Sequence, residues 1–239
     1  MSTAEILTDT LTAPARGLAA AAERRSFVAP LALATLASLA LALVATPRLE
    51  FERAVDDALE SAAAAAPTPQ PVSPHDREVA LARAEKIGRI GAYADGLLGP
   101  ALRALGVAAA LFAAFALLAT PAPFGATLAV VAWGSLPLAL RALLSLPAVL
   151  SMRGVTPDAI ERALPSSAAA LLPATAPPRL AAAASSLDLF SAWAVVLVAL
   201  GMAHATGTAR GRALAVVLVL FASYVLVRHV ALPGLAAVP

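Results

Sequence analysis

Five long stretches of mostly apolar residues constrain this chain more than any other feature. Each is about as long as the roughly 20 residues that an α-helix needs to cross a bilayer. Their apolar residues continue all the way round the helix, which is typical of contact with lipid. The stretches cover residues 27–46, 97–120, 124–150, 187–206 and 213–232. The sequence therefore predicts an all-α fold: a polytopic integral membrane protein with five transmembrane helices.

The composition supports this class. Of the 239 residues, 60% are hydrophobic and 13% charged, and the mean hydropathy is +0.83. Because a soluble domain carries about a quarter of charged residues, these charges are too few to cover a water-facing surface. The net charge of +2, without a dense basic run, argues against a nucleic-acid partner. Arginine far outnumbers lysine, which favours a GC-rich bacterium and hence its inner membrane.

The connections between the stretches are uneven. Residues 120–123 and 207–212 are short enough to make tight antiparallel hairpins, whereas two polar inserts cover 47–96 and 151–186. Residues 1–26 predict an amphipathic segment at the membrane interface, and 233–239 a short C-terminal tail. Basic residues before the first stretch and in the 207–212 turn favour an N-terminus inside, although those of the inserts argue the reverse.

Three helix starts are marked by a hydroxyl residue followed by proline, at 46–47, 73–74 and 156–157. The hydroxyl satisfies a free N–H at the N-cap, and proline has no N–H to leave unsatisfied. We therefore expect helices over 47–65, 74–94 and 157–164. In the first, acidic residues mostly crowd the face opposite an apolar one, as in a helix that lies on a surface.

The start of the fourth stretch combines an acid with two aromatic residues. Ser185 to Asp188 has the form of a capping box, in which Ser185 caps the helix and Asp188 returns a bond to its N–H. Phe190 and Trp193 fall in the first turns, where aromatic rings anchor a span at the headgroup level. A structural role thus explains these residues without any substrate.

Arg141 lies in the third stretch and has two interpretations. It can snorkel to the interface, as we expect more strongly of Arg103 near the start of the second stretch. Alternatively, it faces the bundle and pairs with Asp188 or with carbonyls freed by Pro137. Pro137 and Pro147 are both expected to break this helix. A charge beside a broken helix, here Arg141 with Pro137, is typical of ion and solute sites.

Signs of an enzyme are absent from the sequence. There is no cysteine, which excludes disulfides, thiolate catalysis and cysteine-bound metals. His75, His204 and His229 lie in an insert or at span ends and form no metal-binding pattern, and no HExxH, GxSxG or Walker motif occurs. We predict no catalytic, metal-binding or cofactor-binding residue, and no cofactor.

Several segments are similar to a known family. DLFSAW at 188–193, followed by Gly201 and TGTARGRA at 206–213, resembles the fourth-span signature of the Yip-type (Ypt-interacting protein) membrane family. Residues 27–54, 73–100 and 133–147 resemble the opening, the helical insert and the third span of its bacterial members. The resemblance covers about 25–230 and implies a five-span helical domain without established catalysis. Asp188, Phe190, Trp193 and Gly201 match the family motif as signature residues.

These observations lead to one expected function and one rival. We expect a non-catalytic scaffold, adaptor or membrane-organising protein that meets protein partners through its polar inserts. Deletion of 47–65 is then expected to abolish partner association while leaving insertion into the bilayer intact. The rival is a small-solute or ion pathway lined by the third and fourth spans, at Arg141, Pro137 and Asp188. Alanine-rich spans also suit close helix packing, in a compact bundle or a homo-oligomer.

Overall fold

The computed structural model describes residues 1–52, 55–56, 59, 73–156, 159–160, 163–173, 180 and 184–227. Within these ranges every named element is a helix, and β pairing is limited to isolated bridges. The elements are α1 Thr3–Thr12, α2 Pro14–Arg24, α3 Val28–Ala45, η1 Thr46–Arg48, α5 Pro74–Leu117, α6 Phe124–Gly134, α7 Leu136–Ser151, η2 Ala168–Leu171, α10 Leu189–Thr206 and α11 Arg210–Leu226. The predicted all-α class is confirmed.

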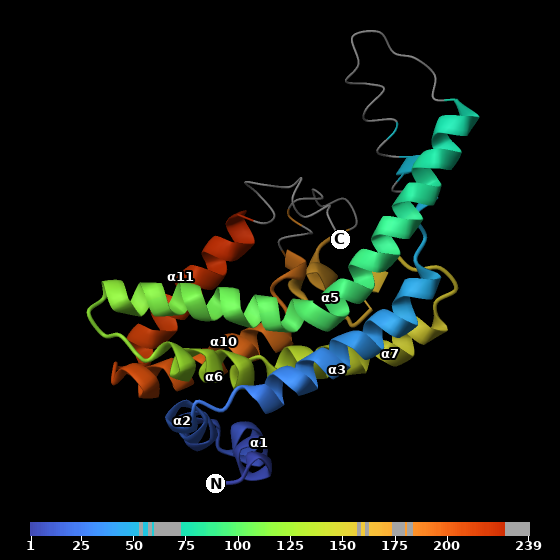
Figure 1. Ribbon diagram of the computed structural model, residues 1–239. Helices are drawn as coiled ribbons and strands as arrows, with labels where there is room; N and C mark the ends of the chain where they lie inside the picture. The colour runs from blue at the N-terminus through green and yellow to red at the C-terminus, as the bar shows by residue number, and fades with distance from the viewer. Residues whose placement is uncertain are drawn as a thin grey trace.

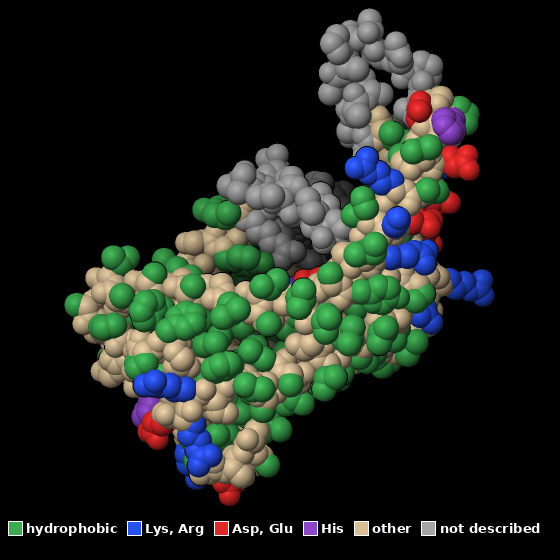
Figure 2. All heavy atoms as spheres, viewed as in Figure 1, with side chains coloured by type: hydrophobic (Ala, Val, Ile, Leu, Met, Phe, Trp, Pro, Cys, Tyr) green, Lys and Arg blue, Asp and Glu red, His purple; other side chains and the backbone are tan. Residues whose placement is uncertain are grey.

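Four helical stretches are long and apolar enough to cross a bilayer: Val28–Arg48, Pro74–Leu117, Phe124–Ser151 and Leu189–Thr206. They coincide with the first four predicted spans. In the fifth, the structure describes the 17 residues of α11, and residues from 228 on lie outside the described part. Figure 2 shows charged side chains at two ends of the molecule and a largely uncharged, hydrophobic surface between them.

The second insert helix and the second span form one helix. Whereas the sequence predicted a helix over 74–94 and a separate span, α5 is continuous for 44 residues. It starts as predicted, because the Ser73 hydroxyl accepts a hydrogen bond from the Asp76 N–H at 3.1 Å and Pro74 follows. Pro100 lies inside the helix, which changes direction there (Figure 1). Residues 74–99, called the arm below, run at an angle to the rest of α5: Gly96 still packs on Ala42 of α3, and the N-terminal part extends beyond the bundle.

The third span is broken in the middle. Ser135 ends α6 and starts α7, with φ −86° and ψ −1°, and Pro137 is among the first two residues of α7. The hydroxyl of Ser135 donates to the Val131 carbonyl at 2.7 Å and so satisfies an acceptor at the break. The expected break at Pro137 is confirmed. The one expected at Pro147 is wrong, since that residue lies within α7.

The helix expected to begin at Pro47 starts later. Instead of capping a new helix, Thr46 continues from α3 into η1, and its buried hydroxyl has no hydrogen-bond partner. Leu49 is extended and helical residues resume at Glu52. The reason is a long-range contact: Arg48 and Glu50 form backbone hydrogen bonds with Val155 at 2.9 and 3.0 Å. Residues 53–54, 57–58 and 60–65 of the predicted helix lie outside the described ranges.

The same backbone contact shows how the spans are arranged. It brings the two inserts together at one end of the bundle, at the C-terminal ends of α3 and α7. At the other end, His204 of α10 lies 3.4 Å from Glu23 of α2. The α5–α6 and α10–α11 turns belong to that end as well (Figure 1). Successive spans therefore run in alternating directions, with α6 and α7 as the two parts of one span.

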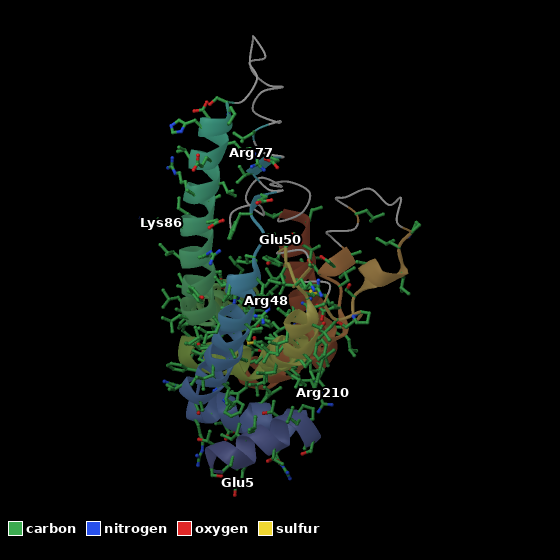
Figure 3. All side chains as sticks on the ribbon, turned by 90° about the vertical axis from the view of Figure 1, so that its right-hand side faces the viewer. Glu5, Arg48, Glu50, Arg77, Lys86 and Arg210 are labelled. Carbon is green, nitrogen blue, oxygen red and sulfur yellow. The ribbon has the colours of Figure 1, made fainter. Side chains whose placement is uncertain are left out.

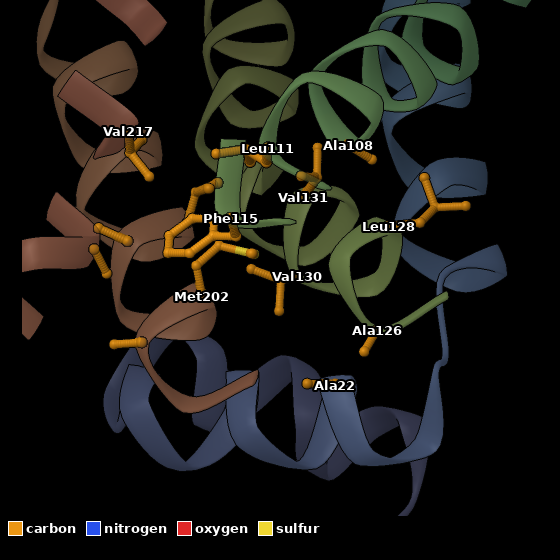
Figure 4. Packing of buried hydrophobic residues seen from close by; sticks show 14 of the residues in the cluster. Ala22, Ala108, Leu111, Phe115, Ala126, Leu128, Val130, Val131, Met202 and Val217 are labelled. Carbon is orange, nitrogen blue, oxygen red and sulfur yellow. The ribbon is translucent and has the colours of Figure 1, made fainter. Parts of the chain in front are cut away.

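The N-terminal residues form two helices that pack on the bundle. Ser2 caps α1 through a capping box with Glu5, and Pro14 opens α2. Ile6, Leu18 and Ala21 pack with Trp133 of α6 and Leu197 of α10. The main core lies between α5, α6, α10 and α11, with Ala22 of α2 at its edge. Its central residues include Phe115, Val130, Met202 and Val217 (Figure 4). The interfacial position of 1–26 stays a prediction.

Candidate functional site

Asp188 is the N-cap of α10. It is extended, and its Oδ1 accepts hydrogen bonds from the N–H groups of Phe190 at 2.8 Å and Ser191 at 3.1 Å. Its Oδ2 accepts a third from the Ser191 hydroxyl at 2.6 Å. The predicted capping box with Ser185 as the cap is therefore wrong. Asp188 does the capping itself, because a carboxylate can accept two of the free N–H groups and complements the helix dipole.

Arg141 of α7 pairs with the same carboxylate. Its Nη1 lies 3.3 Å from Oδ2 of Asp188, and the Asp188 side chain is 0% exposed whereas that of Arg141 is 23% exposed. Of the two interpretations, the structure shows the one in which Arg141 faces Asp188. One oxygen atom of Asp188 thus holds the start of α10, and the other joins α10 to α7.

Pro137 acts on this pair through the backbone. Pro137 lies in the first turn of α7, just after the break, and Arg141 follows it one helical turn later. The next turn is held by Ser145, whose hydroxyl donates to the Arg141 carbonyl at 2.9 Å. Pro137 and Arg141 therefore belong to one helix turn, whose direction the break determines.

The second insert covers the carboxylate. The Leu189 N–H donates to the Ser166 carbonyl at 3.1 Å, and the Ala168 N–H donates to the Leu187 carbonyl at 2.9 Å. Ser167 and Asp188 form an isolated antiparallel bridge. The buried hydroxyl of Ser166 has no hydrogen-bond partner. Sequence reasoning missed this cover, because nothing local to 166–168 indicates that it pairs with a helix start about 20 residues later.

The signature aromatic residues are less exposed than interfacial anchors would be. Phe190 is buried, and Trp193 is partly buried against the cluster that includes Leu18 and Trp133. Trp133 is a further aromatic residue that the sequence analysis did not single out. Its fully buried indole N–H donates to the Ser26 carbonyl at 2.6 Å and so fixes the α2–α3 junction to α6.

Gly201 is one half of a reciprocal glycine contact between α6 and α10. A Cβ atom placed on Gly201 would lie 2.5 Å from Cγ1 of Val130, and one on Gly134 would lie 2.6 Å from Cγ2 of Val198. Each helix thus offers a glycine to a valine of the other. Such close approach through small residues drives helix association inside lipid. The role of Gly201 in this structure is packing.

The remaining charged candidates do not join the site. Arg103 donates to Asp95 at 2.7 Å on the exposed side of α5, and His204 faces Glu23. His75 lies at the tip of the arm, and His229 is outside the described residues. Among residues that the structure describes, no group of three or more His, Asp or Glu side chains could hold a metal ion.

The fold and this site define a class: a polytopic helical membrane protein in which an arginine and a buried carboxylate join two spans. The chain belongs to the Yip1 domain family, which matches residues 8–228. No curated protein and no solved structure matches it. The expected family is therefore confirmed, and the protein is a membrane-associated member of it.

Proposed function

We propose that this protein is a non-catalytic scaffold or adaptor that holds a protein partner at the membrane through its arm. In this proposal the membrane is a bacterial inner membrane and α11 is a fifth span. The observation that carries the proposal is the continuity of α5, which joins a span to a helix outside the bundle (Figure 1). A partner bound to the arm would be held at a fixed position relative to the bilayer.

One side of the arm is covered by the first insert. Phe51 lies against Gly88, where a Cβ atom would overlap the Phe51 ring. Arg77 donates to both carboxylate oxygens of Asp56, at 2.6 and 2.8 Å. These contacts place Phe51 and Asp56 along one side of the arm.

The opposite side of the arm exposes apolar residues. Val79, Ile87 and Ile90 are all exposed, and 3.6 residues per turn place Val79 and Ile90 opposite Gly88. Arg83 and Lys86 lie between them along the helix, and Figure 3 shows Lys86 and Arg77 on the arm. An apolar strip on one side of a helix, bordered by charged residues, supports a protein-binding role for this side of the arm.

A photo-crosslinking residue tests this surface in the full chain. We would place it at Val79, which is 54% exposed, and in a control at Val219 on α11, which is 64% exposed. In membranes of the source cell, Val79 is expected to give discrete protein adducts and Val219 mainly lipid adducts. The same adducts at both positions, or none at Val79, would overturn the proposal. With the crosslinking residue kept at position 79, substituting Ile87 and Ile90 with serine is expected to remove the adducts without affecting insertion.

A second candidate function rests on the partial exposure of Arg141. A guanidinium that is 23% exposed beside a broken helix can attract an anion to a pathway between α7 and α10. Chloride flux into vesicles that contain the protein, compared with flux for Arg141→Leu, tests this alternative. Flux that depends on Arg141 would favour transport over scaffolding, whereas an equal background in both would reject transport.

A further inference from the structure

We infer that the bundle end opposite the inserts binds the headgroups of anionic phospholipids. The site is formed by Arg24, Arg25, Arg210 and Arg212, called the arginine end below. These residues come from two segments nearly 190 positions apart in the sequence, the end of α2 and the start of α11. Neither segment is a strongly basic run by itself, so the site exists only in the folded chain.

One side-chain contact joins the two segments, and two further features set where the arginines lie. His204, just before the α10–α11 turn, lies 3.4 Å from Glu23. Gly207 ends α10 in the left-handed conformation, and Arg210 follows three residues later. Arg25 caps α2, and its side chain lies along α6, where a Cβ atom on Gly125 would be 3.3 Å from its Cδ. Figure 2 shows basic side chains gathered with a histidine at this end, and Figure 3 shows Arg210 near α1 and α2, at the end away from the arm.

The four arginines are exposed and have no carboxylate of their own. Within the described residues none of them makes an ion pair, whereas Arg16, Arg77 and Arg103 each face an aspartate. Glu23 is the acid that lies among them and it faces His204. A guanidinium is always charged and matches phosphate oxygens in a bidentate manner. The arginine end is therefore an unpaired cationic surface suited to phosphate.

The surroundings indicate that this phosphate belongs to a lipid. Leu117 and Leu118 at the end of α5 and Phe124 at the start of α6 are all exposed at the same end of the bundle. Phe124 is held by an edge-to-face contact with Phe112, with ring centroids 5.8 Å apart. Acyl chains can cover this apolar surface while the headgroup meets the arginines. A soluble phosphate or a phosphopeptide would use the arginines but make no use of the adjoining apolar surface.

The test compares two double variants of the full chain in vesicles of phosphatidylcholine and phosphatidylglycerol. Arg210→Gln with Arg212→Gln removes two charges from the arginine end, and Arg83→Gln with Lys86→Gln removes two from the arm. Spin-labelled phosphatidylglycerol measures how strongly the protein prefers this lipid to phosphatidylcholine. We expect the first variant to lower that preference, by up to about fivefold for each arginine, and the second to leave it unchanged.

Three results would overturn the inference. They are an equal loss in both variants, no loss in either, and loss of the preference in the wild type when excess inorganic phosphate is added. The last would mean that the site takes soluble phosphate instead of lipid. Arg210→Lys with Arg212→Lys keeps the charge and is expected to retain most of the preference. Because these side chains are exposed, the variants are expected to fold.

Discussion

The carboxylate of Asp188 binds two helices at once. Its Oδ1 accepts the Phe190 N–H at the start of α10, and its Oδ2 lies 3.3 Å from the guanidinium of Arg141 on α7. A residue that caps one helix does not usually also pair with a charged side chain of another helix. Here one carboxylate serves both roles, so its removal loses the cap of α10 and the contact with Arg141 together.

Asp188→Ala is expected to destabilise the protein by roughly 2–4 kcal/mol, from loss of the cap and of the counter-ion of Arg141. Asp188→Asn keeps an acceptor for the Phe190 N–H and should cost less. Unfolding in mixed micelles measures both. In an Arg141→Leu background the cost of Asp188→Asn should shrink, since the contact between the two side chains is then already absent. Costs that are the same in both backgrounds would mean that the two residues are not coupled.

Gly201→Ala is expected to destabilise the bundle by about 1–3 kcal/mol, because the added methyl group overlaps Val130. Gly106→Ala is the matched control, since a Cβ atom there meets nothing within 4 Å. That control should be neutral or stabilising by about 0.5–1 kcal/mol. The same unfolding assay compares them, and Val130→Ala should restore part of the loss. Equal effects of the two glycine changes would rule out a special role for Gly201 in packing.

Trp133→Phe is expected to loosen the N-terminal helices by removing the donor to the Ser26 carbonyl. If the free energy that keeps this junction closed falls by about 1.4 kcal/mol, tryptic cleavage after Arg24 and Arg25 is expected to rise roughly tenfold. Trp193→Phe serves as the control, since Trp193 is only partly buried. Limited proteolysis in micelles is the measurement. If both variants are cleaved at the wild-type rate, the indole bond does not hold this junction.

The contact between Asp56 and the arm should depend on pH. The hydrogen bond from Arg77 holds the pKa of Asp56 below its ordinary value of 3.8. A lowered pKa in the folded state means that the pair stabilises the contact above that value and loses its effect as the pH falls through the folded pKa. Exchange of the Val55 amide, which donates to the Phe51 carbonyl at 3.0 Å, reports on the contact.

After correction for intrinsic rates, protection of Val55 should be constant from about pH 7 to about pH 5 and fall below pH 3.8. Asp56→Asn should show weaker protection at neutral pH and no such fall. An unchanged acid profile in Asp56→Asn would assign the effect to another group, such as Glu52.

If α11 crosses the membrane, the two ends of the chain lie on opposite sides. Reporter fusions at the N-terminus and after residue 239 are therefore expected to report opposite compartments. A fusion at Thr208, in the α10–α11 turn, should agree with the N-terminal one. Terminal reporters on the same side would reduce the count of spans to four.

The features that could be predicted from the sequence are those that depend only on a short segment of the chain. The apolar stretches required helices of spanning length, Ser73-Pro74 marked the start of α5, and Pro137 marked the break in the third span. Each signal acts through local backbone geometry, so distant residues had little effect on it.

The features that could not be predicted depend on distant partners. Thr46-Pro47 carries the same signal as Ser73-Pro74, but backbone bonds to Val155 extend the chain there instead. Asp188 was misassigned because both capping patterns fit the local sequence. The partner of Trp133 lies 107 residues away, and no pattern in 124–150 indicates it.

The bend in α5 has a mechanical consequence. At 1.5 Å per residue the arm is about 39 Å long, and the 17 residues from 101 to 117 add about 26 Å. The longer limb carries the exposed tip, and the shorter limb carries the buried ring of Phe115. Because Gly96 packs on α3 just before Pro100, a load that tilts the tip is expected to reach α3 first, and only bending at Pro100 would pass it on to the core around Phe115.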